Sequence, residues 1–148
     1  MIKNFDPVQI LIVEDNPNDA ELTMRALKKH NLINEVYIAQ DGKEALDFIF
    51  SEGEFKSRNV ARPLKVIFLD LKLPKISGLE VLTRIKSDPR TKKLPVVIVT
   101  SSKEDPDIKG AYDLGANGYV VKPVDFNAFV KVMQNTGLFW LLVNEPPK

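Results

Sequence analysis

Polar residues that can bind a cation or a phosphoryl group stand directly after apolar runs of this chain. Glu14 and Asp15 follow the run that ends at residue 13, and Asp70 follows the run that ends at residue 69. Thr100 closes another run, and Lys122 follows the last one. If these runs are strands of one parallel sheet, their carboxyl ends meet at the same edge, and the five side chains converge there.

The residue types at this edge define a chemistry. Three carboxylates held together repel one another, so such a cluster either raises pKa values or binds a cation. Oxygen ligands without histidine or cysteine are preferred by Mg²⁺ or Mn²⁺. A lysine and a hydroxyl beside the cation can hold the oxygens of a phosphoryl group. Because the chain has no cysteine and no glycine-rich phosphate loop, the expected nucleophile is a carboxylate that forms an aspartyl phosphate.

Short apolar runs, rich in valine and isoleucine and mostly continuous, predict the strands that position these residues. Such runs are typical of strands that are buried on both faces. The predicted strands are Gln9–Val13, Glu35–Ala39, Lys65–Leu69, Pro95–Thr100 and Gly118–Val121. Predicted strands and segments with helical spacing alternate five times along the chain. This pattern predicts one α/β domain, a doubly wound five-stranded parallel sheet with helices on both faces.

Cap residues and prolines mark the starts of the expected helices. The predicted starts are Asn16-Pro17, Asp41 before Gly42–Phe50, Ser77 before Gly78–Lys86, Asp105-Pro106 and Asp125. Gly53 and Gly115 are expected to end the second and fourth of these helices. The polar stretch Ser51–Pro63 is longer than a usual connection and is interpreted as a surface loop.

The composition excludes several classes of protein. The 148 residues include 21 Lys and Arg and 20 Asp and Glu, so the net charge of +1 lacks the strong positive charge of nucleic-acid-binding domains. The absence of cysteine excludes disulfides and thiol catalysis, and His30 alone cannot form a multi-histidine site. No apolar run approaches the ~20 residues of a membrane span, and the N-terminus is too polar for a signal peptide. We therefore expect a cytoplasmic protein that binds neither nucleic acid nor membrane.

Four motifs at the expected strand ends resemble the signatures of a response-regulator receiver domain of the CheY-like family. They are ILIVEDN at Ile10–Asn16, VIFLDLKLPKISG at Val66–Gly78, VVIVTSS at Val96–Ser102 and GYVVKPV at Gly118–Val124. The resemblance covers roughly residues 8–135, so residues 1–148 are expected to form one receiver domain with a C-terminal extension from residue 136. The stretch 51–63 and the GLFWLLV tail are most similar to stand-alone receivers that are partnered with phytochrome-type histidine kinases.

The resemblance implies a phosphorylation site and a metal site. Asp70 would accept a phosphoryl group from the phosphohistidine of a sensor histidine kinase. Asp15 and Asp70 would ligate Mg²⁺, Glu14 would do so through water, and Lys72 would contribute its backbone carbonyl. Glu14 stands where the family more commonly has aspartate. The protein would then be a phosphoacceptor that catalyses only its own phosphorylation and dephosphorylation.

The resemblance also implies a switch that changes the affinity of the protein for its partners. Thr100 would move to hydrogen-bond the phosphoryl oxygen, and Lys122 would pair with that oxygen. The ring of Tyr119 would turn inward when Thr100 moves. Lys72 and Ser102 would flank the phosphoryl group and tune its lifetime.

Three other functions compete with this one. A Mg²⁺-dependent phosphatase with an aspartyl nucleophile typically carries a second aspartate two positions later, where this chain has Lys72. A structural module that has lost phosphorylation would not need Asp70, Thr100 and Lys122 together. A flavodoxin-like cofactor binder needs a loop rich in Ser, Thr and Gly after the first strand, which this chain lacks. Taken singly, each site residue could also be an ordinary polar residue at a strand end.

The C-terminal segment carries two apolar stripes at helical spacing. One stripe comprises Phe126, Phe129, Val130, Met133, Gly137, Trp140 and Leu141, and the other comprises Ala128, Val132, Thr136, Phe139 and Val143. We expect the first stripe to pack on the sheet. The second predicts either a homodimer through the last helix and the fifth strand, or a break at Gly137 after which the tail folds back; both remain open.

Overall fold

Five parallel strands form one sheet in the order β2-β1-β3-β4-β5. The computed structural model describes residues 8–28, 36–58, 64–122, 127–128, 131–132 and 135. The strands are β1 Ile10–Val13, β2 Val36–Ala39, β3 Val66–Leu69, β4 Val96–Thr100 and β5 Gly118–Val121. Strands β1, β3 and β4 begin one residue later than the sequence predicts, and β5 has the predicted bounds. The predicted first residue of β2, Glu35, lies outside the described residues. The predicted fold class is confirmed.

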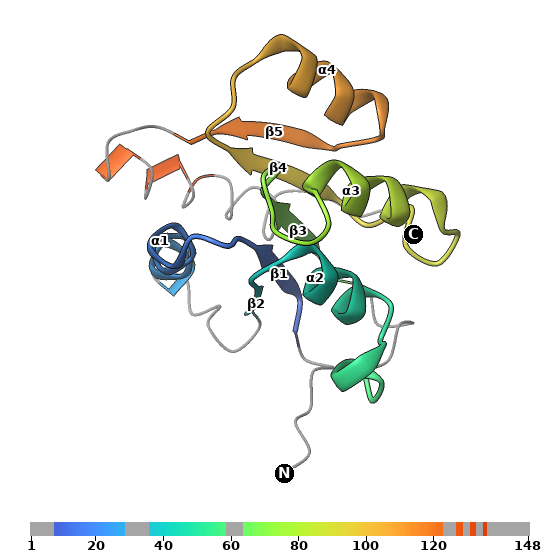
Figure 1. Ribbon diagram of the computed structural model, residues 1–148. Helices are drawn as coiled ribbons and strands as arrows, with labels where there is room; N and C mark the ends of the chain where they lie inside the picture. Colours follow the sequence, from blue (N-terminus) through green and yellow to red (C-terminus); the bar gives the residue numbers. More distant parts are fainter. Residues whose placement is uncertain are drawn as a thin grey trace.

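Helices cover both faces of the sheet. The described helices are α1 Pro17–Lys28, α2 Gly42–Ile49, the 3₁₀ helix η2 Gly53–Phe55, α3 Gly78–Ser87 and α4 Asp105–Asp113. Helix α1 lies on one face, whereas α2, α3 and α4 lie on the other (Figure 1). Strands β1 and β3 are neighbours although β2 separates them in the sequence, so the chain changes its winding direction between them. Ligand sites of such sheets form at this switch point.

The core is divided by the sheet into two layers, because alternate side chains of a strand point to opposite faces. Leu11 and Val13 belong to the larger cluster, which includes buried residues of α2, α3 and α4. Ile10 and Ile12 belong to the smaller cluster on the other face, against which Leu22 of α1 packs. All four of these β1 residues are buried, as the continuous apolar run predicts.

Side-chain caps confirm three of the predicted helix starts. The Asn16 Oδ1 atom accepts hydrogen bonds from the amides of residues 18 and 19, at 2.9 and 3.2 Å. The side chain of Asp41 accepts one from the amide of residue 44 at 2.8 Å, and that of Ser77 accepts one from the amide of residue 80 at 3.3 Å. These bonds satisfy backbone donors that have no partner within the helix.

The start of α4 differs from the prediction by one residue. The cap position is Glu104, whose side chain makes no cap hydrogen bond, and Asp105 and Pro106 are the first two helical residues. Proline is tolerated there because the missing N–H has no intrahelical acceptor to lose. The predicted end is confirmed, since Gly115 follows α4 with a left-handed φ of 103°.

The predicted end of α2 at Gly53 was wrong, and the segment after it is less simple than a surface loop. Ser51, with a left-handed φ of 54°, follows α2, and Gly53 opens η2 instead of ending α2. The described part of the expected surface loop, residues 51–58, is partly buried. Phe55 packs edge-on against Phe48 with ring centroids 5.1 Å apart. The buried Arg58 guanidinium lies 4.7 Å from the Phe48 ring centroid and donates to the carbonyls of residues 48 and 49, both at 3.1 Å.

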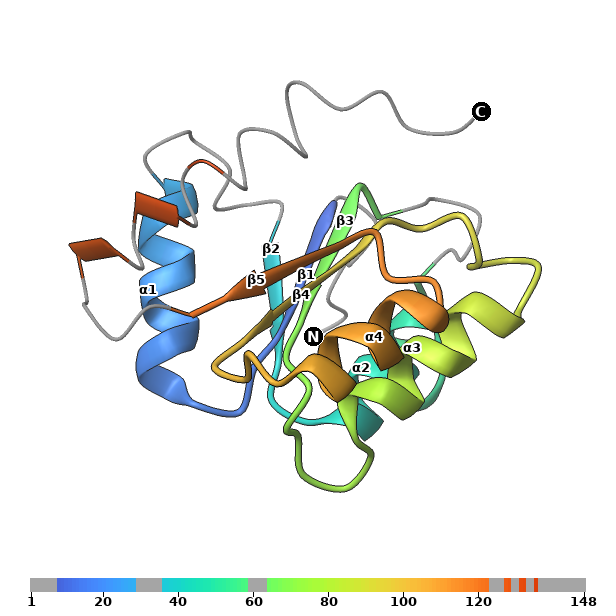
Figure 2. The ribbon, with the colours of Figure 1, turned by 90° about the horizontal axis from the view of Figure 1, so that it is seen from above.

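Several predictions fall on residues outside the described ranges. They include the start of the last helix at Asp125 and most of the two C-terminal stripes. Short helical pieces at residues 127–128 and 131–132 follow β5 on the α1 side of the sheet (Figure 2). Among the described residues, no helix has both the length and the apolar character needed to cross a membrane.

Candidate functional site: an acidic cluster and a lysine at the sheet switch point

The predicted site residues follow strands whose carboxyl ends share one edge of the sheet. The loops after β1 and β3 lie at that edge, on either side of the switch point (Figure 2). The β1 and β3 strands pair in register, with Val13 opposite Leu69, so the residues that follow them are also adjacent. The amide of Asp70 donates to the carbonyl of Val13 at 3.1 Å and fixes this alignment.

Three carboxylates converge at this point. One carboxylate oxygen each of Glu14, Asp15 and Asp70 lies within 4.8 Å of the other two. Glu14 and Asp70 are buried, with 6% and 8% of their surface exposed, whereas Asp15 faces solvent. Hard oxygen donors at this spacing, open to water on one side, suit a divalent cation such as Mg²⁺ or Mn²⁺.

Lys122 is the cation that the chain itself supplies to this cluster. Its Nζ atom donates to Asp70 Oδ2 and to Asp19 Oδ2, both at 3.0 Å, and makes a close ion pair with Glu14 Oε1. Only 10% of the Lys122 side chain is exposed. The ammonium has three N–H donors, and these three carboxylates occupy all of them.

Burial and the ion pairs shift the pKa values of this pair. Burial raises the pKa of the Glu14 carboxyl to about 7, although the hydrogen bond and charge of Lys122 act to lower it. Burial acts to lower the pKa of Lys122, but the hydrogen bond and charge of Glu14, with the charge of Asp70, raise it above its usual range. Lys122 is therefore a cation at the site, and the ionisation of Glu14 is costly for the folded state.

The loop after β3 holds Asp70 through backbone contacts. The amide of Lys72 donates to Asp70 Oδ1 at 3.3 Å. The amide of Gly78 donates to the carbonyl of Leu71 at 2.9 Å, which brings the start of α3 against the site. A Cβ atom at Gly78 would lie 2.1 Å from the carbonyl oxygen of Asp70, so only glycine allows this approach.

Thr100 and Tyr119 meet at the loop between β4 and α4. Thr100 is fully buried, and its Oγ1 accepts a long hydrogen bond of 3.4 Å from the amide of Ser102. The Tyr119 hydroxyl donates to the Ser102 carbonyl at 2.8 Å, and the ring packs against the larger core cluster. The carbonyl of Thr100 accepts from the amide of Lys122 at 2.7 Å, which ties this loop to the acidic cluster.

The sequence reasoning missed two residues that hold the site. Asp19, in the first turn of α1, is the third acceptor for Lys122. Asp107, in the first turn of α4, accepts a short hydrogen bond from the Ser102 hydroxyl. The sequence near Asp19 gives no signal for this contact, because its partner Lys122 is 103 positions away. Asp107 is distinguished only by its position near a helix start.

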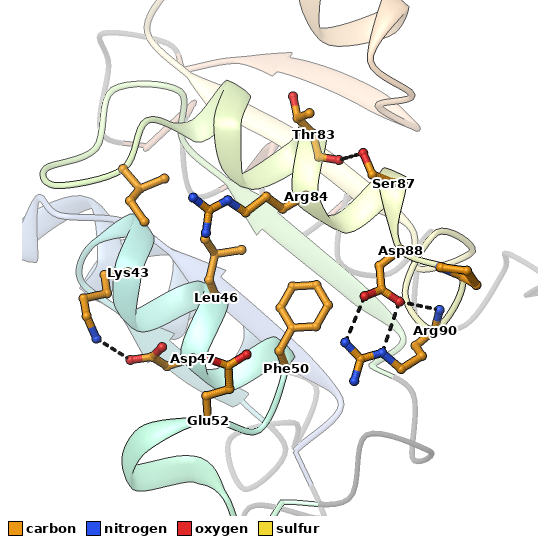
Figure 3. Close-up of a pocket in the computed structure, with 12 residues that line it drawn as sticks. Lys43, Leu46, Asp47, Phe50, Glu52, Thr83, Arg84, Ser87, Asp88 and Arg90 are labelled. Atoms are coloured by element: carbon orange, nitrogen blue, oxygen red, sulfur yellow. Dashed lines mark hydrogen bonds and ion pairs between the residues drawn. The ribbon is translucent and has the colours of Figure 1, made fainter.

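A separate cavity of about 640 Å³ lies between α2 and α3 (Figure 3). None of the predicted site residues lines it. Its three cations are each paired locally: Lys43 with Asp47 at 2.8 Å, Arg84 with Glu80 at 3.0 Å, and Arg90 with Asp88 at 2.9 Å. In the described part of the chain, the cavity therefore offers no unpaired cation that could recognise a phosphoryl group.

Known proteins resemble this chain over nearly its whole length. The profile of the response regulator receiver domain matches residues 10–134. The response regulator Rcp1 of Synechocystis sp. is 38% identical over 135 residues, which are 91% of this chain and 90% of Rcp1. The crystal structure of the Mn²⁺-bound form of Rcp1 has a TM-score of 0.86 at 37% identity and covers 94% of this chain and 98% of that one.

Two further solved structures are phytochrome response regulators. The phosphorylated cyanobacterial phytochrome response regulator RcpA has a TM-score of 0.86 at 39% identity, covering 94% of this chain and 97% of that one. The bacteriophytochrome response regulator AtBRR is 50% identical with a TM-score of 0.68, covering 92% and 96% of the two chains. Receiver domains are phosphorylated on an aspartate and bind a divalent metal at an acidic pocket, and the resemblance to this family is confirmed. The chain belongs to the response regulator receiver domain family and is a phosphoacceptor of two-component signalling, homologous to stand-alone phytochrome response regulators.

Proposed function

We propose that Asp70 is the aspartate of this receiver that accepts the phosphoryl group, from the phosphohistidine of a phytochrome-type sensor kinase. The observation that supports this choice is the 3.0 Å contact between Asp70 and Lys122 inside the carboxylate cluster. Asp70 follows β3 at the switch point and has both a cation and the Lys72 amide beside it. Asp15 is exposed, and Glu14 is buried with a raised pKa, so Asp70 is the better-placed nucleophile.

In the proposed step, a carboxylate oxygen of Asp70 attacks the phosphorus of the phosphohistidine. A P–O bond forms while the P–N bond breaks, and the leaving imidazole keeps the electron pair and takes up a proton. The product is an acyl phosphate on Asp70. Its hydrolysis, in which a water oxygen attacks the phosphorus and the Asp70 carboxylate leaves, completes a cycle that the protein catalyses only on itself.

The proposed metal is Mg²⁺. Asp15 and Asp70 would bind it directly, Glu14 would bind it through water, and the backbone carbonyl of Lys72 would complete the protein ligands. The carboxylates of Glu14, Asp15 and Asp70 share the single ammonium of Lys122 with Asp19, so the site keeps an excess of negative charge that favours a divalent ion. When bound, such an ion stabilises the negative charge that develops on the phosphoryl oxygens.

Thr100, Tyr119 and Lys122 form the proposed switch. Phosphorylation adds about −1.5 to −2 charge beside Lys122. Lys122 then donates to a phosphoryl oxygen, and the Thr100 hydroxyl exchanges its long bond with the Ser102 amide for a bond to the phosphoryl group. Because Tyr119 is bonded to the Ser102 carbonyl, movement of this loop changes the position of the ring and the surface of α4 and β5.

Incubation with acetyl phosphate and Mg²⁺, followed by intact-mass spectrometry, tests this function. We expect the protein to gain one phosphoryl group and the Asp70→Asn variant to gain none, because an amide is not a nucleophile for this step. Asp113→Asn is a matched control, since Asp113 is an exposed aspartate paired with Lys109 at 2.6 Å on α4. Equal labelling of the Asp70→Asn variant would assign the phosphoryl group to another residue.

The proposal extends to the size of the domain and its place in the cell. Residues 1–148 would form one receiver domain, with residues 136–148 as an extension of the last helix. Phosphotransfer from an ATP-dependent kinase would take place in the cytoplasm. The net charge of +1 supports a protein partner rather than nucleic acid.

The proposed assembly is a homodimer through the last helix and β5. Tyr112 on α4 and Val121 on β5 support it, because they are large apolar side chains that are 50% and 37% exposed. Phe139 of the second C-terminal stripe lies outside the described residues and would extend this surface. Sedimentation should show a dimer for the unmutated protein, and a monomer that still accepts phosphate for Phe139→Asp. A monomeric unmutated protein at high concentration, with and without phosphodonor, would exclude the dimer.

A further inference from the structure

We propose that Asp19 is a positioning residue that keeps Lys122 aimed at the phosphoryl group throughout the phosphorylation cycle. This inference rests on the proposed role of Asp70 and deepens it. Asp19 does not belong to the three-carboxylate cluster, yet its Oδ2 atom lies 3.0 Å from Lys122 Nζ, the same distance as Asp70 Oδ2.

The backbone of Asp19 is fixed on both sides. Its amide donates to Asn16 Oδ1 at 3.2 Å, and its carbonyl accepts from the Thr23 hydroxyl at 3.0 Å. Asp19 lies in the first turn of α1, where the helix dipole stabilises a negative charge. Its side chain is 30% exposed, so the carboxylate keeps part of its hydration while it binds the buried ammonium. A rigid backbone therefore directs this carboxylate toward Lys122.

The three acceptors of Lys122 have different fates when the site is used. Asp70 becomes the phosphorylated group, and the bond of Lys122 to Asp70 must be exchanged for one to a phosphoryl oxygen. Glu14 is a proposed water-mediated metal ligand, so its charge is shared with the cation. Asp19 takes part in neither reaction nor metal binding, and its bond to Lys122 is the one that persists.

A fixed anchor matters because a lysine side chain is flexible. Lys has four rotatable side-chain bonds, and holding it in one conformation costs rotamer entropy. Asp19 holds the ammonium from the α1 side while the group on Asp70 changes. Without this anchor, Lys122 would remain charged but would be less often aligned with the phosphoryl oxygen, which slows the transfer.

A double-mutant cycle tests whether Asp19 acts through Lys122. The rate of phosphorylation by acetyl phosphate is measured for the unmutated protein, Asp19→Asn, Lys122→Ala and the double variant. We expect Asp19→Asn to slow phosphorylation on the order of tenfold. In the Lys122→Ala background the same change should have no further effect, because the residue it positions is absent. Multiplicative effects of the two changes would overturn the proposal.

Two further measurements separate positioning from a purely structural role. Asp19→Glu retains the charge at a partly exposed position and should recover most of the rate. Without metal or phosphodonor, NMR of the Lys122 ammonium should show faster hydrogen exchange with water in Asp19→Asn than in the unmutated protein. An unchanged exchange rate, or a slow Asp19→Glu variant, would show that Asp19 does not hold Lys122.

Glu21→Gln is the matched control, because Glu21 is an acid of the same helix that pairs with Arg25 at 2.9 Å on the exposed surface. Its phosphorylation rate should equal that of the unmutated protein, and a tenfold loss there would attribute the effect to the charge of α1 in general. The cycle is interpreted only if the unmutated protein is labelled and Asp70→Asn is not. If the unmutated protein is not labelled, the proposed function is rejected. If it is labelled on Asp70 but the effects of Asp19→Asn and Lys122→Ala on the rate multiply, only the role of Asp19 is rejected.

Discussion

Lys122 and Asp70 are 52 positions apart in the chain, yet Lys122 Nζ lies 3.0 Å from Asp70 Oδ2. The contact joins the loop after β5 to the loop after β3, across the intervening strand β4. A buried ion pair of this kind is costly to break, since removal of one partner leaves the other charge buried. The pair therefore links the stability of this sheet edge to the chemistry of the site.

Mg²⁺ should stabilise the folded protein against heat. The carboxylates of Glu14, Asp15 and Asp70 repel one another, and an ion that binds only the folded state stabilises it by mass action. At a hundredfold excess over Kd the gain is about 2.7 kcal/mol. Asp15→Ala should remove most of this gain and should not reduce metal-free stability. A melting temperature indifferent to millimolar Mg²⁺ would contradict the metal site.

Glu14 should make metal-free stability depend on pH. Burial raises its folded-state pKa from 4.5 to about 7, so between these values the folded protein holds a proton that the unfolded chain has lost. The contribution of Glu14 to the free energy of unfolding therefore falls as the pH rises through this window, on the order of 1–3 kcal/mol. The free energy of unfolding, measured with a denaturant at several pH values and with a chelator to remove metal, tests this prediction.

The comparison variant for this measurement is Glu14→Gln, which cannot ionise. Relative to the unmutated protein, its free energy of unfolding should increase between about pH 5 and about pH 8. If the difference in the free energy of unfolding between the two proteins is the same at both pH values, Glu14 titrates normally in the folded state.

Gly78→Ala should destabilise the fold and displace Asp70. The added Cβ atom would lie 2.1 Å from the Asp70 carbonyl oxygen and 2.6 Å from the Leu71 Cα atom, so the backbone must shift. We expect a loss of about 1–3 kcal/mol in the free energy of unfolding and slower phosphorylation. Gly110→Ala is the matched control: a Cβ atom there would meet no atom of another described element within 4 Å, and alanine in a helix should stabilise by about 0.5–1 kcal/mol. Equal effects of the two changes would exclude the backbone clash as the cause.

Arg58→Met should destabilise the packing between η2 and α2. The change keeps much of the volume of the side chain but removes a guanidinium that donates to the carbonyls of Phe48 and Ile49, both at 3.1 Å. We expect a loss of about 2–3 kcal/mol. Arg84→Met removes an exposed arginine paired with Glu80 at 3.0 Å and should cost less than about 0.5 kcal/mol. Similar melting temperatures for the two variants would show that the Arg58 contacts contribute little.

The strands and most helix starts were predictable because their signals are local. Continuous apolar runs predict strands buried on both faces, and the Asn16, Asp41 and Ser77 caps act within three residues of their own position. The convergence of three predicted site residues was predictable for a related reason. They directly follow the strands, so the parallel topology alone brings Glu14, Asp15 and Asp70 to one edge.

The partners of Lys122 and the packing of Arg58 depend on contacts between distant segments. Lys122 and Asp19 are 103 positions apart, and nothing near either residue in the sequence indicates that the first turn of α1 faces the end of β5. Arg58 lies in a polar segment without a regular spacing of apolar residues, so the sequence does not predict that its guanidinium packs against the Phe48 ring. The order of the amino acids is enough to place these residue types at the strand ends. Which of them share hydrogen bonds depends on the packing of the whole domain, because a side chain reaches its partner only after the helices have packed on the sheet.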